Sequence, residues 1–136
     1  MGIKERHAHY LNLTFKEAIV DSLAANIAVI DGGGEVLAVN ASWQHFAVAN
    51  HMDDKTAGVG ANYFDACRAA GADPNARAAL QGILDVLCGK RSVFYHEYPC
   101  HSPWEKRWFA MRVTPLVDNL GCLAISHENI THRAGA

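Results

Sequence analysis

The chain has 136 residues, half of them apolar, a formal net charge of −2 and eight histidines, which suits a single domain with one hydrophobic core. Its Lys and Arg residues form no cluster and no apolar run approaches the roughly 20 residues that span a bilayer, so we expect neither nucleic-acid binding nor membrane contact. The start lacks the apolar stretch of a secretion signal and the four cysteines stand at unrelated spacings, which favours a reduced, cytoplasmic protein.

The first predicted element is a helix over residues 15–24. Thr14 and Glu17 have the spacing of a capping box, in which the two side chains satisfy free amides at the helix start. Two short runs rich in β-branched residues follow, Ile27–Asp31 and Glu35–Val39, and three glycines separate them. Because glycine permits the backbone angles of a tight turn, these runs predict two adjacent antiparallel strands.

A second helix is predicted after Asn40, whose side chain can cap the free amides at its start. Trp43 and Phe46 follow at helical spacing, so the two aromatic rings share one face, and we expect that face to look at the sheet. The next segment, His51–Ala61, is polar and contains glycine, which predicts a loop.

Two more helices are predicted in the middle of the chain. Asn62 can cap a short one. Asp73 and Pro74 predict the start of a longer one, because a proline at the first helical position loses no helical hydrogen bond. Gly89 predicts its end, since glycine readily adopts the left-handed conformation that terminates a helix. These helices fill the segment between two groups of strands.

Three strands are predicted in the last third, at Ser92–Pro99, Lys106–Leu116 and Leu120–Glu128. Strands gathered at both ends of a chain with helices between them are typical of an α+β domain. We therefore predict a five-stranded antiparallel sheet with the helices packed on one face.

The final hairpin can be given a register if Asp118–Asn119 forms a two-residue turn. Val113 then faces Ala124 and Met111 faces Ser126 on one side of the sheet. Ser126 would accordingly share a face with the apolar residues of the preceding strand.

The same register places apolar residues on the opposite side of the hairpin as well. Trp108, Leu123 and Ile125 would lie there, and such a surface needs a cover because a sheet face open to water normally alternates with polar residues. The cover is either the N-terminal helix or a second copy of the chain. We predict a homodimer through this face and the N-terminal helix.

Taken in order, these motifs resemble the PAS family of sensory domains. The final tail carries the most weight, because it is similar to the Asp-Ile-Thr ending by which such domains pass from their last strand into a signalling helix. Asn129 stands where the family usually has Asp. The matching segments are Ile27–Asp31, Val39–Trp43, Gly60–Phe64, Arg107–Phe109, Val113–Leu116 and Glu128–Thr131.

The resemblance implies a PAS-like domain over residues 15–133, after an N-terminal extension over 1–14 and before a tail over 134–136. It further implies a non-catalytic bacterial sensory module that binds a small molecule, or none, and relays its state to an output domain after Thr131. That output would be a sensor kinase of a two-component system, a cyclase or a regulator. A pure dimerisation module without ligand is the alternative. A small enzyme is a third interpretation, for which the chain offers no convincing nucleophile, base or metal cluster.

The predicted ligand pocket lies between the sheet and the helices, where mostly aromatic and aliphatic residues would form the wall. Two polar members, His96 and Ser126, would orient a small, partly aromatic or carboxylated metabolite. The same set also describes a solid core, so the pocket interpretation requires a cavity within it. The candidate residues are Trp43, Phe46, Tyr63, Phe64, Leu80, Leu84, Phe94, His96, Phe109, Met111, Val113 and Ser126.

The same resemblance narrows the choice of cofactor. Flavin photosensors of the family carry a reactive cysteine directly after the position of Asn62, and a tyrosine there argues against a covalent flavin photoadduct. Haem-binding members often take an axial histidine from the long helix, but Asn75–Gly89 contains none. His45, His96 and His127 remain as haem ligands, although each is more often a hydrogen-bonded or solvated imidazole. A small metabolite or no ligand is therefore favoured, with haem as an open alternative.

A metal site at His96, Cys100 and His101 is a weak alternative. Imidazole and thiolate suit zinc, but a closed site needs a fourth ligand and a fixed backbone. Pro99 and Pro103 instead mark a strand end and a loop. We predict no metal.

Overall fold

The computed structural model describes residues 18–50, 52, 54–116 and 121–134. Residues 18–22 are helical, and the capping box predicted at Thr14 and Glu17 lies outside the described residues. The named elements that follow are β1 (Asn26–Ile30), β2 (Val36–Val39), α2 (Ala41–Ala49), α3 (Asp54–Ala57), α4 (Tyr63–Ala69), α5 (Pro74–Leu87), β3 (Phe94–Pro99), β4 (Trp108–Pro115), β5 (Leu123–Asn129) and α6 (Thr131–Ala134).

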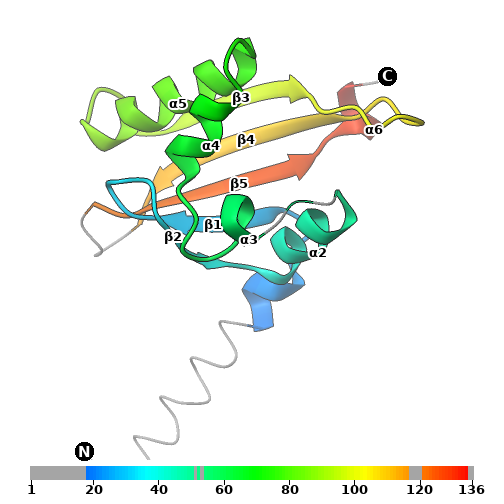
Figure 1. Cartoon of the computed structure of the whole chain (residues 1–136), viewed down its shortest axis with the longest axis horizontal. Helices are drawn as coiled ribbons and strands as arrows, with labels where there is room; N and C mark the ends of the chain where they lie inside the picture. Colours follow the sequence, from blue (N-terminus) through cyan, green and yellow to red (C-terminus); the bar gives the residue numbers. More distant parts are fainter. Residues whose placement is uncertain (1–17, 51, 53, 117–120, 135–136) are drawn as a thin grey trace, which may run out of the picture.

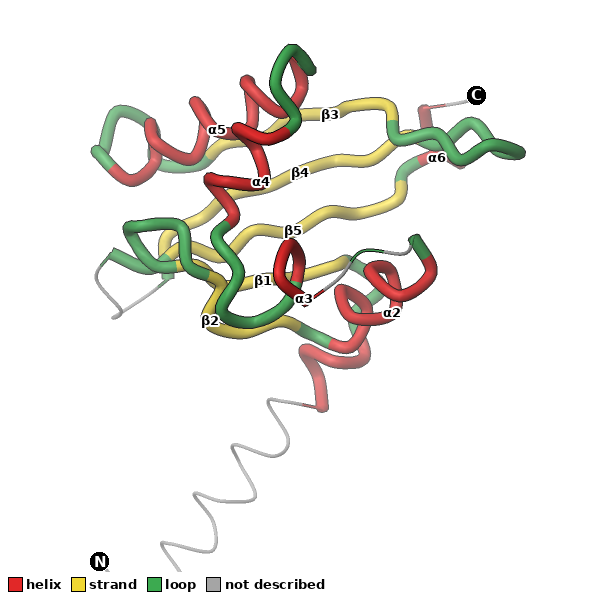
Figure 2. Tube along the Cα trace, viewed as in Figure 1, coloured by secondary structure: helices red, strands yellow, loops and turns green. Residues whose placement is uncertain are grey.

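The five strands form one antiparallel sheet in the order β2-β1-β5-β4-β3 (Figure 1). The last strand, β5, is therefore the central one, and it leads directly into α6. Figure 2 shows helices α2 to α5 on one side of this sheet. This arrangement confirms the predicted α+β, PAS-like fold.

Local capping signals set the starts of three helices. The side-chain oxygens of Asn40, Asn62 and Asp73 accept backbone N–H groups in the first turns of α2, α4 and α5 respectively. Gly89, directly after the C-cap of α5, has a φ of 79° and ends that helix in the left-handed region as predicted. Each of these boundaries follows from residues close in sequence, which is why the sequence could predict them.

The predicted loop at His51–Ala61 is wrong in part, because α3 forms within it. The methyl group of Ala57 is buried, and its carbonyl accepts the indole N–H of Trp43 at 2.7 Å. A single helical turn is too short to show a hydrophobic period, and tertiary packing rather than a sequence pattern holds it.

The predicted register of the final hairpin is wrong by one residue. Val113 pairs with Ile125 and Met111 pairs with His127. The N–H of Leu116 donates to the carbonyl of Cys122, which continues the observed register beyond the two strands. The turn predicted at positions 118 and 119 lies outside the described residues. A register shift of one residue changes every cross-strand partner in the hairpin.

The register also corrects the predicted dimer face. Leu123 and Ile125 are almost fully buried and belong to the core on the helix-covered side of the sheet, so they cannot form the outer surface. Trp108 does lie on the outer side, with 36% of its surface exposed. The described part of the N-terminal helix is hydrogen-bonded to the start of α2, through the side chain of Asp21 and the amide of Ala41.

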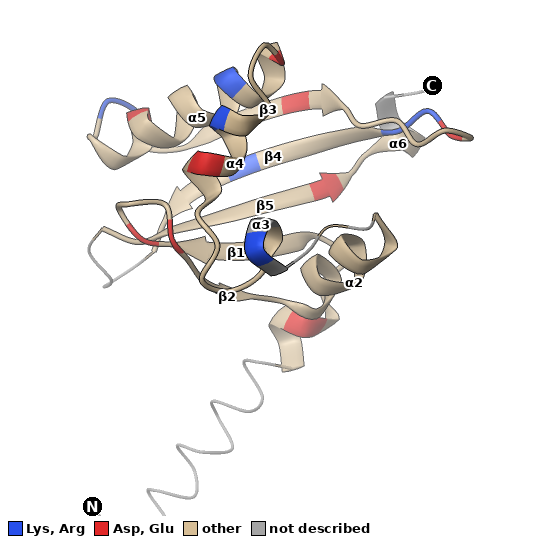
Figure 3. Cartoon of the chain, viewed as in Figure 1, with Lys and Arg blue, Asp and Glu red and all other residues tan. Residues whose placement is uncertain are grey.

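The core lies between the sheet and the helices, where α5 packs against β3 and β4 and α2 packs against β1. The buried cluster consists of Ala28, Ile30, Val36, Phe64, Ala79, Ile83, Val86, Phe94, Met111, Val113, Leu123 and Ile125. In the described parts of the chain, acidic and basic residues are dispersed over strands, helices and turns (Figure 3). No helix in the described ranges has the length and apolar character needed to cross a bilayer.

Candidate functional site

A cavity of about 350 Å³ opens within the space between the helices and the core face of the sheet. Its volume lies at the lower end of the range that small-molecule sites occupy. Among the described residues, apolar side chains and two cysteines form most of its wall: Trp43, Phe46, Ala47, Met52, Ala57, Ala66, Cys67, Ala76, Ala79, Pro99, Cys100, Phe109 and Met111. Seven polar residues complete it: Asn26, Tyr63, Asp73, Asn75, His96, Tyr98 and His127.

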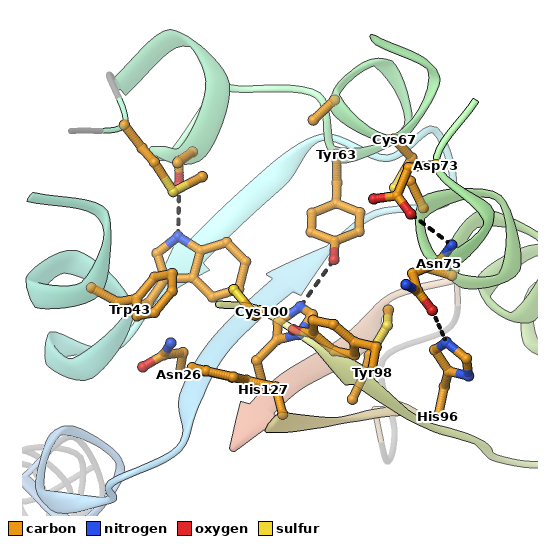
Figure 4. Close-up of a pocket in the computed structure, with 18 of the residues that line it drawn as sticks. Asn26, Trp43, Tyr63, Cys67, Asp73, Asn75, His96, Tyr98, Cys100 and His127 are labelled. Atoms are coloured by element: carbon orange, nitrogen blue, oxygen red, sulfur yellow. Dashed lines mark hydrogen bonds between the residues drawn. The ribbon is translucent and has the colours of Figure 1, made fainter. Parts of the chain in front are cut away.

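Three of the polar residues form a continuous network across the cavity (Figure 4). The hydroxyl of Tyr63 lies 3.0 Å from Nε2 of His127, and the hydroxyl of Tyr98 lies 2.6 Å from Nδ1. Trp43 packs beside the imidazole, with ring centroids 5.9 Å apart. These contacts join α2, α4, β3 and the central strand β5 around one side chain.

Burial keeps this network uncharged. Removal from water lowers the pKa of His127 from 6.5 to about 4, because a buried imidazolium loses its hydration. Burial also raises the pKa of Tyr63 and of Tyr98 above their ordinary value of 10. At neutral pH the site therefore holds a neutral imidazole between two neutral phenols.

A second polar chain lies at the start of α5. Asp73 accepts the backbone N–H of Asn75 at 2.9 Å, as the N-cap of the helix. The side-chain oxygen of Asn75 lies 3.1 Å from Nε2 of His96, so that ring nitrogen carries the proton. His96 is stacked between Phe94 and Tyr98 along β3. This chain fixes the helix end against the strand.

Two aromatic rings in the cavity wall contact one another. The rings of Phe46 and Phe109 meet edge to face, with centroids 5.5 Å apart. The guanidinium of Arg107 lies 5.7 Å from each of these two ring centroids, and its Nε donates to the carbonyl of Cys100 at 2.8 Å. The Arg107 guanidinium thus packs against these two rings, but Arg107 is not among the described residues that line the cavity.

Half of the predicted site residues line the cavity. These are Trp43, Phe46, Tyr63, His96, Phe109 and Met111. Four others, Phe64, Leu80, Phe94 and Val113, pack in the core or against it, and they do not line the cavity.

Two predicted site residues are placed wrongly. Leu84 is 38% exposed, because it lies on the solvent side of α5. Ser126 lies on the outer face of the sheet, where it lines a small hollow with Tyr95 and Arg112. The slip in the predicted register explains the error, because a shift by one residue exchanges the two faces of a strand.

The sequence analysis named His127, the residue at the centre of the network, only as a possible haem ligand and left it out of the predicted pocket. Its signal was available, since His127 follows Leu123 and Ile125 at a period of two and must share their face. Tyr98 alternates in the same way with Phe94 and His96. Asn26 carried no comparable signal, because it precedes the predicted strand.

Most of the ring nitrogens at the cavity are engaged within the protein and are not free to bind a haem iron or a metal ion. Both ring nitrogens of His127 are hydrogen-bonded to tyrosines, and Nε2 of His96 is bonded to Asn75. In the described part of the chain, no three His, Cys, Asp or Glu side chains gather as a metal site requires. The nitrogen Nδ1 of His101 instead accepts the backbone N–H of Arg107 at 2.9 Å.

Comparison with known proteins identifies the fold. One relative, described as an uncharacterized 104.1 kDa protein in the hypE 3′ region of Rhodobacter capsulatus, is 43% identical over 125 residues. The match covers 88% of this chain and 13% of that protein. The chain therefore spans a small part of the relative's length.

Solved structures agree in fold. The PAS domain of Bordetella pertussis BvgS superposes with a TM-score of 0.61 at 20% identity, over 91% of this chain and 90% of that one. The PAS domain of the Cronobacter turicensis quorum-sensing receptor RpfR, solved in complex with C12:0, gives 0.53 at 18% identity, over 82% and 99%. The family model described as PAS fold matches residues 20–134. The chain belongs to the PAS fold family.

Proposed function

We propose that this chain is a non-catalytic sensory domain that binds a small ligand in the cavity and relays its occupancy to an output domain after α6. The observation that carries the proposal is the position of His127. This residue lies on the central strand, contacts side chains from α2, α4 and β3, and stands four residues before the start of α6. A ligand that moves the imidazole acts on the strand that leads out of the domain.

The junction after β5 is built to carry such a movement. The side-chain oxygen of Asn129 accepts the backbone N–H of Thr131 at 3.0 Å and also accepts the hydroxyl of Thr131. A carboxylate oxygen of Asp at this position would accept the same two hydrogen bonds. The hydroxyl of Thr131 in turn accepts the N–H of Trp108 at 3.1 Å, and buried Ile130 donates its N–H to the carbonyl of Trp108. A shift of β5 relative to β4 would therefore reorient the start of α6.

The relatives support a larger signalling protein. The matched relative is far longer than this chain, and PAS domains commonly sit upstream of output domains. We expect a kinase, cyclase or regulator there, and we retain residues 15–133 as the sensory unit. The cytoplasmic location stays a prediction from the sequence. The RpfR complex with C12:0 is consistent with ligand binding by this fold.

Self-association is the second part of the proposal, because PAS domains commonly dimerise. Trp108 and Tyr95 lie on the outer face of the sheet and expose 36% and 46% of their surfaces. We place the dimer contact on this face and the N-terminal helix, without Leu123 and Ile125. Sedimentation velocity of wild type and Trp108→Ser tests it: a monomeric wild type would rule the dimer out.

The ligand proposal is tested on freshly purified protein by native mass spectrometry, followed by calorimetry against a metabolite panel. We expect a bound or binding small molecule whose affinity falls in His127→Phe. Binding should also shift the backbone amide signals of Ile130 and Thr131. A protein that carries no ligand and binds none would be a dimerisation module only, and binding without a change at Ile130 would contradict the relay.

A further inference from the structure

The chemical class of the ligand can be inferred from Asn26, an inference that rests on the proposed ligand-binding function. Asn26 is the first residue of β1, and its backbone pairs with His127 across the sheet. The residue is only 8% exposed, and its side chain lines the cavity beside His127 (Figure 4). Within the described parts of the chain, its carboxamide forms no hydrogen bond. No fully buried side-chain N or O atom there lacks a partner, so the polar atoms of Asn26 remain accessible from the cavity.

An accessible carboxamide that has no protein partner can give both its donor and its acceptor to a ligand in the cavity. Asn26 presents an N–H donor beside a C=O acceptor in one plane. The complementary partner is an edge that carries the same two groups side by side, as in a lactam or a primary amide. Such an edge satisfies both groups at once when its donor faces the side-chain oxygen of Asn26 and its acceptor faces the side-chain nitrogen.

The Tyr63–His127–Tyr98 network adds a further donor. A neutral imidazole has one N–H and one lone pair, so one tyrosine donates to the ring while the other accepts from it. The tyrosine that accepts keeps its own O–H proton, and neither hydroxyl has another hydrogen bond among the described residues. That proton is available to an acceptor atom in the cavity.

The charges around the cavity argue against an ionised ligand. No Lys or Arg is among the described lining residues, and the one carboxylate there, Asp73, caps α5. A buried carboxylate ligand would lack a counter-charge, which disfavours the carboxylated metabolite that the sequence left open. The aromatic wall of Trp43, Phe46 and Phe109 instead suits a flat, apolar ring system.

We propose that the cavity binds an uncharged, planar molecule through a lactam-type edge held by Asn26, with a second acceptor atom held by the free hydroxyl of the tyrosine pair. The aromatic side chains of α2 and β4 pack against its faces. The recognised class is therefore a neutral nitrogen heterocycle or cyclic amide.

Three probes of one ring size test this assignment on the full 136-residue chain. Quinolin-2-one has the lactam edge, N-methylquinolin-2-one lacks its donor, and 2-naphthoate carries a charge. We expect isothermal titration calorimetry to give quinolin-2-one an affinity at least about tenfold higher than either analogue. Equal or tighter binding of N-methylquinolin-2-one or 2-naphthoate would overturn the inference while leaving ligand binding intact.

Two variants test whether Asn26 causes the preference for quinolin-2-one. Asn26→Leu should reduce the preference for quinolin-2-one over its N-methyl analogue to less than about threefold. Gln44→Leu, the same type of change at an exposed position of α2 that does not line the cavity, should keep it. If Asn26→Leu keeps the full preference for quinolin-2-one, Asn26 does not bind the lactam edge and the inference fails.

Two remaining outcomes are also decisive. If Asn26→Leu does not fold, the three-probe comparison on wild type still decides the class. If quinolin-2-one does not bind at its solubility limit, the inference is wrong as stated. The proposed function is judged separately by the metabolite screen, so a ligand found there would keep the sensory role and reject this chemistry.

Discussion

Two buried asparagines in this domain have similar exposure but opposite environments. Asn40 is 2% exposed and all its hydrogen-bonding groups are used. Its oxygen accepts the amides of Ile27 and Trp43, each at 3.0 Å, and its nitrogen donates to the carbonyls of Val20 and Ala25 at 3.1 and 2.9 Å. This side chain ties the N-terminal helix, β1 and α2 together.

Asn26 is 8% exposed and uses none of its side-chain groups on the described protein. It opens onto the cavity beside His127, whose hydrogen bonds to Tyr63 and Tyr98 leave one hydroxyl proton unassigned. The comparison shows that burial of a polar residue does not reveal its role. The number of hydrogen bonds that the protein itself supplies separates a structural polar residue from one available to a ligand.

The largest expected effect comes from Asn40→Ala. The change removes four hydrogen bonds to the backbone, although the carbonyl of Val20 keeps another partner, the N–H of Leu23 at 3.3 Å. We expect the free energy of unfolding to fall by about 2 to 4 kcal/mol. Urea denaturation measures it. Asn40→Asp keeps the acceptor and loses the donors, so its loss should be smaller than that of the alanine variant. A loss below about 1 kcal/mol in Asn40→Ala would contradict the structural role.

The next effect is a pH dependence centred on His127. The folded protein holds the imidazole neutral, so the unfolded chain binds the proton first as the pH falls from 6.5 towards 4. Stability should be full above 6.5 and should decrease through this window by on the order of 3 kcal/mol. Tyr63, Tyr98 and Trp43 surround the ring, and none of them titrates in this window.

Carboxylates also titrate at the acidic end of this window, so the His127 contribution is obtained as a difference. Thermal unfolding of wild type and His127→Gln between pH 7 and 4 gives that difference. The stability of the variant should depend less on pH than that of the wild type. His45→Gln, at an exposed position of α2, should follow wild type. Parallel profiles for wild type and His127→Gln would show that the imidazole is not buried as described.

A smaller effect is expected for Tyr98→Phe. Loss of the hydroxyl leaves Nδ1 of His127 without its partner at 2.6 Å and should cost about 1 to 2 kcal/mol of unfolding free energy. Tyr95→Phe is the matched control on the same strand, because this hydroxyl bonds the exposed side chain of Glu97 at 2.7 Å on the outer face. Denaturant unfolding of both variants should separate them; equal losses would mean that the buried contact adds nothing.

The smallest effect on stability is expected for Asn26→Leu. The variant removes a carboxamide that the protein does not satisfy and adds apolar surface, so the free energy of unfolding should change by less than about 1 kcal/mol or rise. The same unfolding assay measures it beside Asn40→Ala. A loss as large as that of the Asn40 variant would show that Asn26 has a structural partner and would remove the contrast between the two residues.

The sequence predicted the parts of the fold that neighbouring residues determine. Caps at Asn40, Asn62 and Asp73 and the left-handed glycine at the end of α5 marked the helices. The final hairpin was different, because a strand pattern does not by itself show which residues of two strands pair. The error of one residue in the predicted register placed Ser126 in the predicted site and left His127 out of it.

The remaining site residues depend on tertiary structure. The pattern on β3 placed His96 towards the helices, and the structure agrees. The contact of Tyr63 with His127 joins residues 64 positions apart, and the cavity beside Asn26 exists only because α2, α4 and β5 meet there. No periodicity or motif in the sequence predicts the Tyr63–His127 contact or the cavity beside Asn26.

The most direct test follows the side-chain amide signals of Asn26 and Asn40 in ¹H–¹⁵N spectra while quinolin-2-one is added. The account predicts that the Asn26 Nδ2 signals shift in proportion to occupancy and that the Asn40 signals stay in place. Binding that leaves Asn26 unchanged, or that moves both side chains equally, would contradict it.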